Sequence, residues 1–186
     1  MRHLSNPDGS KWAWLSDDGR LRYALGRTWS AVPPLGFVML NPSTADHDVD
    51  DPTIRRCVGF AKREGAGGIV VCNVSPMRAT DPAELYREAE ANADIGIITG
   101  YYSIVADELR PCSRVVLGWG AMAGASTLAR QMLQMFAGAL CLRLRDEVDQ
   151  LWCLGTSADG SPRHPLYLSA AAPLVEWSGD RPRRAA

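Results

Sequence analysis

The chain has 186 residues, of which 46% are hydrophobic and 22% are charged, and its formal net charge is −1. This composition is typical of a soluble domain with a packed core, so we expect a single domain over residues 1–186. The longest apolar runs are too short to span a bilayer, and the first residues lack the apolar core of a signal peptide. A cytoplasmic location is therefore expected. The near-neutral charge excludes a global positive field that would attract nucleic acid, although a local basic groove would escape this count.

Five cysteines are scattered along the chain, and none forms a C-x-x-C pair. Zinc and iron–sulfur sites need more closely spaced ligands. We therefore expect reduced and mostly buried thiols, and we predict no metal and no cofactor.

The first predicted element is a β-hairpin. Residues 12–15 and 21–25 alternate partly between apolar and polar, and the Asp18-Gly19 pair between them is a turn signal. We expect residues 1–31 to form an N-terminal hairpin extension. An α/β core over residues 32–178 and a loose tail over residues 179–186 would follow.

An uncharged apolar run over residues 35–40 predicts a strand that is buried on both faces. Pro42 cannot continue a ladder, so the polar residues that follow lie just beyond the carboxyl end of this strand. Ligands of open α/β sheets bind at that edge. The candidate site residues here are Asn41, Pro42, Ser43, Thr44 and Asp46.

A helix is predicted to begin at Asp51-Pro52, with Asp51 as its cap, and to end before the glycines of residues 65–68. A second buried strand over residues 69–73 again ends in an asparagine, Asn73. This strand–helix–strand order predicts a right-handed parallel crossover.

The later elements follow the same alternation. Helical patterns begin at Asp81-Pro82 and resume through Ile95, Ile98 and Leu109. The remaining predictions are a buried strand over residues 114–118, a helix over 121–136, and short strands over 140–144 and 151–155. We predict the α/β class: a three-layer α/β/α sandwich with a mostly parallel central sheet.

The strongest candidates for site chemistry are Asn41, Asn73 and His164. An asparagine amide offers two donors and one acceptor, which match the edge of a planar amide or nucleobase, although it also caps turns and helices. His164, in a late loop, can donate to a developing anion, or it is a surface residue. The phosphate-binding candidates are Arg55, Arg56, Arg78 and Arg163, and a surface pair with Asp50 or Asp51 is the alternative for Arg55 and Arg56.

Two further features are weaker. Gly118-Trp119-Gly120 predicts a tight turn with close backbone approach, but it is not a dinucleotide-binding fingerprint. His47 with the carboxylates of residues 46–51 has the chemistry of a divalent-metal site, and a solvated acidic loop is the alternative.

Residues 39–46, 51–57 and 162–167 resemble a bacterial family, domain of unknown function 1643. More distantly, the layout resembles the uracil-DNA glycosylase superfamily. Asn41-Pro42, the strand ending in Asn73, the glycine turn of residues 118–121 and His164-Pro165 follow the order of that superfamily's motifs. The chain departs from it at Ser43, in the missing serine after His164-Pro165, and in the absence of an aromatic at the usual stacking position.

The distant resemblance implies a uracil-DNA-glycosylase-like fold and cleavage of an N-glycosidic bond, with the base extruded into the pocket. Asn41 would position the attacking water, Asn73 would bind the base edge, and His164 would stabilise the leaving base. Asp46 is an alternative base for the water, and Leu166 would be a wedge in the base stack.

Two other functions remain open at this stage. One is a non-catalytic module that binds nucleic acid or a nucleotide, and the other is a metal-dependent enzyme that uses the loop of residues 46–51. The expected partner of the glycosylase-like enzyme and of the non-catalytic module is a nucleic acid or a nucleotide.

Overall fold

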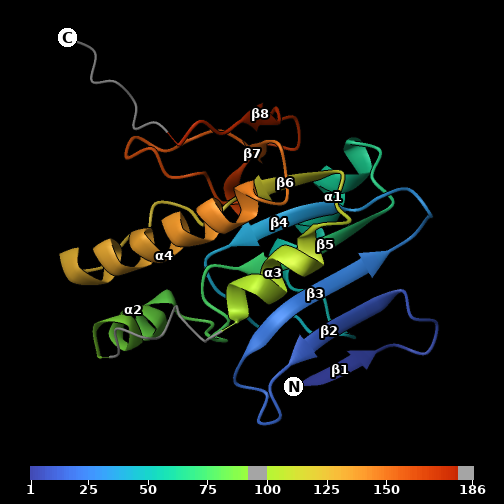
Figure 1. The fold of residues 1–186 in the computed structure, drawn as a ribbon, viewed down its shortest axis with the longest axis horizontal. Helices are drawn as coiled ribbons and strands as arrows, with labels where there is room; N and C mark the ends of the chain where they lie inside the picture. The colour runs from blue at the N-terminus through green and yellow to red at the C-terminus, as the bar shows by residue number, and fades with distance from the viewer. Residues whose placement is uncertain (92–99, 180–186) are drawn as a thin grey trace.

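Eight strands form one mixed sheet in the computed structural model, which describes residues 1–91 and 100–179 (Figure 1). Their order across the sheet is β1-β2-β3-β5-β4-β6-β7-β8. The strands are β1 (Arg2–Ser5), β2 (Lys11–Leu15), β3 (Arg22–Thr28), β4 (Leu35–Met39), β5 (Gly68–Asn73), β6 (Arg114–Leu117), β7 (Leu151–Cys153) and β8 (Val175–Glu176).

The sheet is parallel only in its centre. Three of the seven neighbouring pairs, among β5, β4, β6 and β7, are parallel, and the other four are antiparallel. The predicted hairpin forms between β2 and β3, and β1 adds a further antiparallel strand that the sequence analysis missed. Short loops can join only antiparallel neighbours, so these N-terminal strands make the whole sheet mixed rather than mostly parallel.

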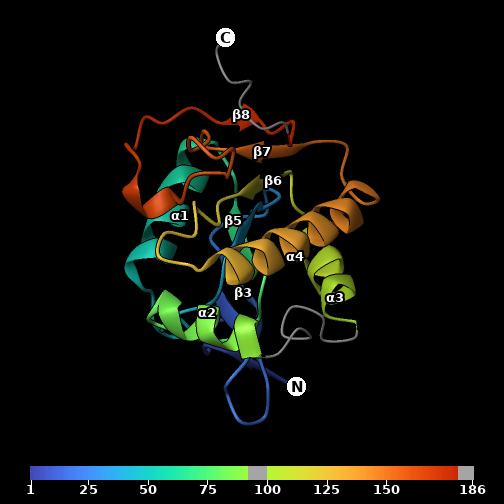
Figure 2. The same ribbon diagram turned by 90° about the vertical axis from the view of Figure 1, so that its left-hand side faces the viewer.

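Helices cover both faces of the sheet (Figure 2). On one face, α1 (Pro52–Arg63) packs against Leu35, Phe37 and Met39. On the other face, α2 (Pro82–Ala91), α3 (Tyr101–Leu109) and α4 (Thr127–Arg145) cover Val38 and Leu40. Successive side chains of a strand point to opposite faces, so burial on both explains why the β4 segment carries no charge.

The parallel pairing predicted for the strands on either side of α1 is confirmed, because β4 and β5 are parallel neighbours with Met39 opposite Asn73. Asp51 caps α1 by accepting a hydrogen bond from the N–H of Ile54 at 2.8 Å, and Pro52 occupies the first turn. The carboxyl ends of both strands therefore meet at one edge of the sheet.

The prediction for α4 is wrong in two respects. The helix begins at Thr127, not near residue 121, and it continues through residues 140–144, which were predicted to form a strand. Leu140 and Leu144 alternate with polar positions as in a strand, but they also continue the helical spacing of Leu133 and Phe136, and all four are buried against the sheet. The segment before Thr127 is a loop instead.

In the helical region after Asp81, the described residues form the helices α2 and α3. Gly100 precedes α3 with a φ of 83°, a left-handed conformation that glycine adopts readily. Ile95, Ile98 and residues 180–186 of the expected tail lie outside the described residues.

All five cysteines are free, and four of them are buried, as predicted. Burial raises the pKa of the Cys112 and Cys141 thiols to about 12. Among the described residues, no helix has the length and apolar character needed to cross a bilayer.

Candidate functional site

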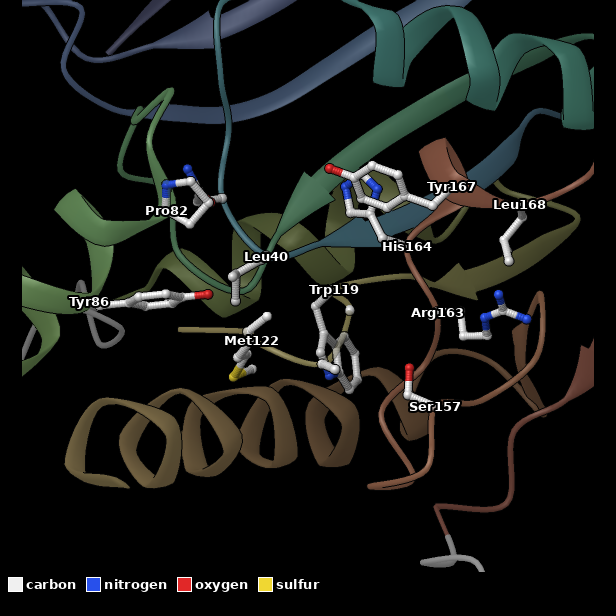
Figure 3. A pocket seen from close by; sticks show the side chains of 14 residues that line it. Leu40, Pro82, Tyr86, Trp119, Met122, Ser157, Arg163, His164, Tyr167 and Leu168 are labelled. Atoms are coloured by element: carbon white, nitrogen blue, oxygen red, sulfur yellow. The ribbon is translucent and has the colours of Figure 1, made fainter. Parts of the chain in front are cut away.

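A pocket of about 400 Å³ lies at the carboxyl ends of β4 and β6 (Figure 3). This is the edge where open α/β sheets bind ligands, and the volume lies in the range of small-molecule sites. Four predicted site residues line it: Asn41, Trp119, Arg163 and His164. The other lining residues come from the end of β4, from α2, from the loops after β6 and β7, and from the segment around the 3₁₀ helix η1 (Pro165–Tyr167): Leu40, Pro82, Tyr86, Gly120, Ala121, Met122, Ala123, Ser157, Tyr167 and Leu168.

The amide of Asn41 is fixed by two backbone contacts. Its Nδ2 donates to the carbonyl oxygens of Pro42 at 3.0 Å and of Ala79 at 2.9 Å. An amide nitrogen has only two hydrogens, so both donors are used. What Asn41 can still offer a ligand is its side-chain oxygen, which is an acceptor.

His164 is held in one tautomer by the turn that it caps. Its Nδ1 accepts a hydrogen bond from the N–H of Leu166 at 3.3 Å, which leaves the proton of the neutral ring on Nε2. Burial lowers the pKa of His164 below its usual 6.5, and the negative charge of Asp51 opposes this only in part. At neutral pH the ring is therefore an uncharged hydrogen-bond donor.

Aromatic rings form much of the remaining wall. Trp119 is 7% exposed and packs edge-on against Trp177, with ring centroids 5.8 Å apart. Tyr86 projects from α2, whereas Tyr167 lies beside His164 with 5.6 Å between their centroids. Tyr167 is 80% exposed, so it forms an open rim. Figure 3 places Tyr86 at one end of the pocket and Arg163 at the other, with Trp119 between them.

Asn73 does not line the pocket. Its side chain is 1% exposed, and its Oδ1 accepts a hydrogen bond from Nη2 of Arg22, which is 2% exposed, at 3.2 Å. Arg22 also donates to the carbonyl of Ala45 at 3.0 Å. Asn73 therefore organises the interior beneath the loop that follows β4, although its strand end adjoins that of Asn41.

The rest of that loop is folded against the protein. Pro42 is buried, and Arg78 spans the loop by donating to the carbonyls of Ser43 and Thr44, both at 3.3 Å. Asp46 caps its own turn, since its Oδ1 accepts from the N–H groups of Asp48 and Val49 at 2.9 Å. Partial burial raises the pKa of Asp46, but these hydrogen bonds together with the nearby His47 and Arg78 lower it below its usual value. Pro42, Ser43, Thr44, Asp46 and Arg78 are not pocket-lining residues.

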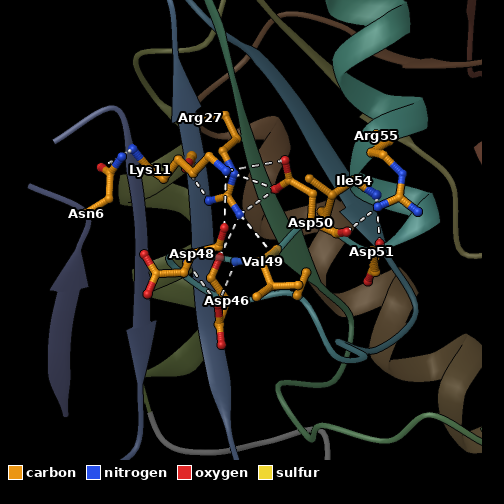
Figure 4. A network of polar contacts seen from close by, with 12 residues as sticks. Asn6, Lys11, Arg27, Asp46, Asp48, Val49, Asp50, Asp51, Ile54 and Arg55 are labelled. Carbon is orange, nitrogen blue, oxygen red and sulfur yellow. Dashed lines mark hydrogen bonds and ion pairs between the residues drawn. The ribbon is translucent and has the colours of Figure 1, made fainter. Parts of the chain in front are cut away.

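The acidic loop of residues 46–51 is a structural network (Figure 4). The buried Arg27 pairs with Asp50 at 2.7 Å and donates to the carbonyl of Asp46 at 2.6 Å. Asp51 caps α1, and His47 pairs with Asp48 at 3.3 Å. Among the described residues, no three His, Cys, Asp or Glu side chains are arranged to hold a metal ion. The geometry therefore gives no support to the metal-dependent alternative.

The other predicted phosphate ligands bind backbone carbonyls. Arg55 donates to the carbonyl of Asp50, and Arg56 donates to that of Leu168 while lying over the ring of Phe60. Leu166 lies in η1 and does not line the pocket. Of the four candidate arginines, Arg163 is the one at the pocket.

The sequence analysis missed Tyr86, Met122, Ser157 and Tyr167. Tyr167 had a signal, because it lies three residues after His164 in a loop with two prolines. Tyr86 and Met122 had none, since an apolar residue in or near a helix usually belongs to the core.

Comparisons with known proteins identify a family but no described relative. A family model described as "Protein of unknown function (DUF1643)" matches residues 22–166, from the first residue of β3 into η1, and this region contains Asn41, Trp119, Arg163 and His164. Neither the curated proteins nor the solved structures contain a significant match. The family model covers well over half of the chain, and the chain therefore belongs to the DUF1643 family.

Proposed function

We propose that the pocket binds the base of a nucleotide or of a nucleic acid strand. The observation that carries this proposal is the pairing of one fixed acceptor with one fixed donor. Asn41 has its oxygen left over, and His164 has its proton on Nε2. Both residues line the same pocket, and an acceptor and a donor there can complement a base edge that carries an N–H and an acceptor, such as the N–H and C=O of a pyrimidinone or purinone.

The pocket walls suit the faces of such a base. Trp119 and Tyr86 supply apolar and aromatic surface, and base–aromatic stacking is worth about 1–3 kcal/mol per base. Arg163 at the rim is exposed and can contact a phosphate or sugar oxygen. No aspartate or glutamate is among the lining residues of the described pocket, so no carboxylate of its wall contacts a bound phosphate.

Binding is tested by calorimetric titration of the protein with uridine, guanosine and adenosine 5′-monophosphates and with a short single-stranded oligonucleotide. Adenine also offers a donor beside an acceptor, so the discriminating ligand is N3-methyluridine 5′-monophosphate, which lacks the edge N–H and is expected to bind more weakly than uridine 5′-monophosphate. Equal affinity for uridine and N3-methyluridine 5′-monophosphates, or no binding, would contradict the proposal.

Hydrolysis of an N-glycosidic bond is the second candidate, and the state of His164 favours it. A neutral imidazole that holds its proton on Nε2 can stabilise negative charge as it develops on a leaving base. The Asn41 oxygen can orient a water but cannot act as a strong base, so we expect slow turnover. Release of free base from uracil-containing single- and double-stranded DNA is the assay, with His164→Asn as the inactive comparison. Binding without base release would support the binding function and contradict hydrolysis.

A further inference from the structure

The outer face of α4 carries an apolar stripe. Leu128, Met135 and Leu142 follow one another at intervals of seven residues, and their exposed fractions are 53%, 58% and 71%. Seven residues are close to two helical turns, so the three side chains lie in one line. Met132, which is half-buried, and Ala139, which is exposed, lie beside that line at helical spacing.

This stripe is separate from the face that holds α4 in the fold. The residues that pack toward the sheet include Leu133, Phe136, Leu140 and Leu144, all 0% exposed. In Figure 2, α4 crosses the outside of the sheet beside α2 and α3. The helix is therefore apolar both toward the core and along part of its solvent side, which is typical of a helix with a second partner.

We propose that this face binds the same face of a second copy of the chain, with the two α4 helices antiparallel and the two-fold axis at Met135. In that register the residue numbers of facing positions add up to 270, so Leu128 faces Leu142 and Met135 faces itself. Gly138 faces Met132, and a Cβ built on Gly138 would meet nothing within 4 Å. Met132 of each copy thus meets a glycine of the other, and both copies contribute the same patch, as an isologous interface requires.

The charges at the helix ends fit the same arrangement. Arg145 is exposed in the last turn of α4, and the exposed Glu90 of α2 accepts a hydrogen bond from Ser126, the N-cap of α4. Antiparallel packing brings Arg145 of each copy toward Glu90 of the other. It also places the positive end of each helix dipole beside the negative end of its partner. A parallel pair would bring like ends together.

The size of this helix face limits the expected affinity of the dimer. A helix of 19 residues is about 28 Å long, and contact along one side of it forms an interface at the low end of the range for specific complexes. We therefore expect a concentration-dependent dimer rather than an obligate one.

Analytical ultracentrifugation of the full chain between about 1 μM and 1 mM tests the proposal. We expect the wild type to form a reversible dimer, and Met135→Glu to raise its dissociation constant at least about ten-fold, because two like charges meet at the axis. Met135→Leu is the matched control and retains the dimer. A wild-type chain that is monomeric throughout this range would overturn the proposal.

Two double variants test the direction of packing. Leu128→Lys with Leu142→Glu places opposite charges face to face in the antiparallel dimer and like charges in a parallel one. Leu128→Glu with Leu142→Glu places like charges in both. Dimer retention by the first and loss by the second support the register, whereas loss in both overturns it. If Met135→Glu lowers the melting temperature without changing the association state, the stripe is covered by the chain itself and the proposal is wrong.

Discussion

Nη2 of Arg22 donates a hydrogen bond to Oδ1 of Asn73 at 3.2 Å, and this contact joins the start of β3 to the carboxyl end of β5 inside the protein. Burial lowers the pKa of Arg22 to about 10, and the negative charge of Asp51 opposes that shift. Nδ2 of Asn73 and Nε of Arg22 have no hydrogen-bond partner among the described residues. Asn73 is thus one of few groups that compensate a buried cation.

We predict that Asn73→Ala lowers the free energy of unfolding by about 1–3 kcal/mol, because it removes an acceptor from a buried guanidinium. Urea denaturation measures this change. Asn73→Asp, which restores an acceptor and adds an opposite charge, is expected to lose less. If Asn73→Ala keeps full stability but loses ligand binding, Asn73 contacts the base directly, as the sequence analysis expected.

His164→Asn separates the two roles of His164. The asparagine oxygen can accept the N–H of Leu166 and keep the cap, whereas the ring donor is lost. We expect a change in stability below about 1 kcal/mol and a loss of ligand affinity of about ten-fold, the worth of one hydrogen bond to a buried group. Calorimetric titration and urea denaturation of the same preparation measure both quantities. Unchanged affinity would remove His164 from the binding site.

The lowered pKa of His164 predicts a pH dependence of stability. The unfolded ring takes up a proton near pH 6.5, whereas the folded ring does so only at a lower pH. Between these two pKa values the unfolded state binds more protons, so the unfolding free energy falls as the pH falls below about 6.5. His164→Asn lacks this contribution. The test compares the urea midpoints of the wild type and His164→Asn at about pH 7.5 and about pH 5.5. An equal fall of the midpoint in both proteins would contradict the prediction.

The acidic loop is predicted to depend on Arg27 and not on a metal ion. Arg27→Met removes the closer of the two cations that pair with Asp50, the other being Lys11, and three hydrogen bonds to the carbonyls of residues 26, 46 and 49. We expect a loss of about 2–3 kcal/mol in unfolding free energy, since hydrogen bonds to charged groups are involved. Mg²⁺ and a chelator should leave the wild-type melting temperature unchanged. A rise with Mg²⁺ would revive the metal-dependent alternative.

Gly118 controls the approach of η1 to the sheet. A Cβ at this position would lie 2.9 Å from Cδ of Pro165 and 3.2 Å from Sδ of Met39. Gly118→Ala should therefore displace Pro165, and with it His164, and we expect weaker ligand binding together with a stability loss of about 1–3 kcal/mol from overpacking. Gly59→Ala in α1, where a Cβ would meet nothing within 4 Å, is the control. Unchanged ligand affinity in Gly118→Ala would show that ligand binding does not depend on the position of η1.

Much of the central fold could be predicted because local signals agreed with the packing. The β4 run was uncharged because both of its faces are covered, and Asp51-Pro52 marked the start of α1 correctly. The register of the outer strands and the length of α4 depend on tertiary contacts. Residues 140–144 fit both a strand and a helix pattern, and only packing against the sheet decides between them.

The sequence predicted where the site lies, but it predicted only some of the residues that line it. Asn41 and His164 both reach the pocket, because the edge of a parallel sheet gathers the loops that follow its strands. Asn73 also ends a strand at this edge, yet Arg22, some 50 residues earlier in the chain, binds its side chain in the interior. No local pattern reveals a partner at that sequence separation.

The most direct test of the account is calorimetric titration of nucleoside 5′-monophosphates into the wild type, His164→Asn and Arg163→Gln, with Arg110→Gln as a control. Arg110 is an exposed arginine that pairs with Glu147 and lies just before β6, at the opposite edge of the sheet. The account predicts saturable one-to-one binding of a base with an N–H and C=O edge, weakened in both pocket variants and unchanged in Arg110→Gln. Binding that all three variants retain equally, or no heat with any nucleotide, would contradict it.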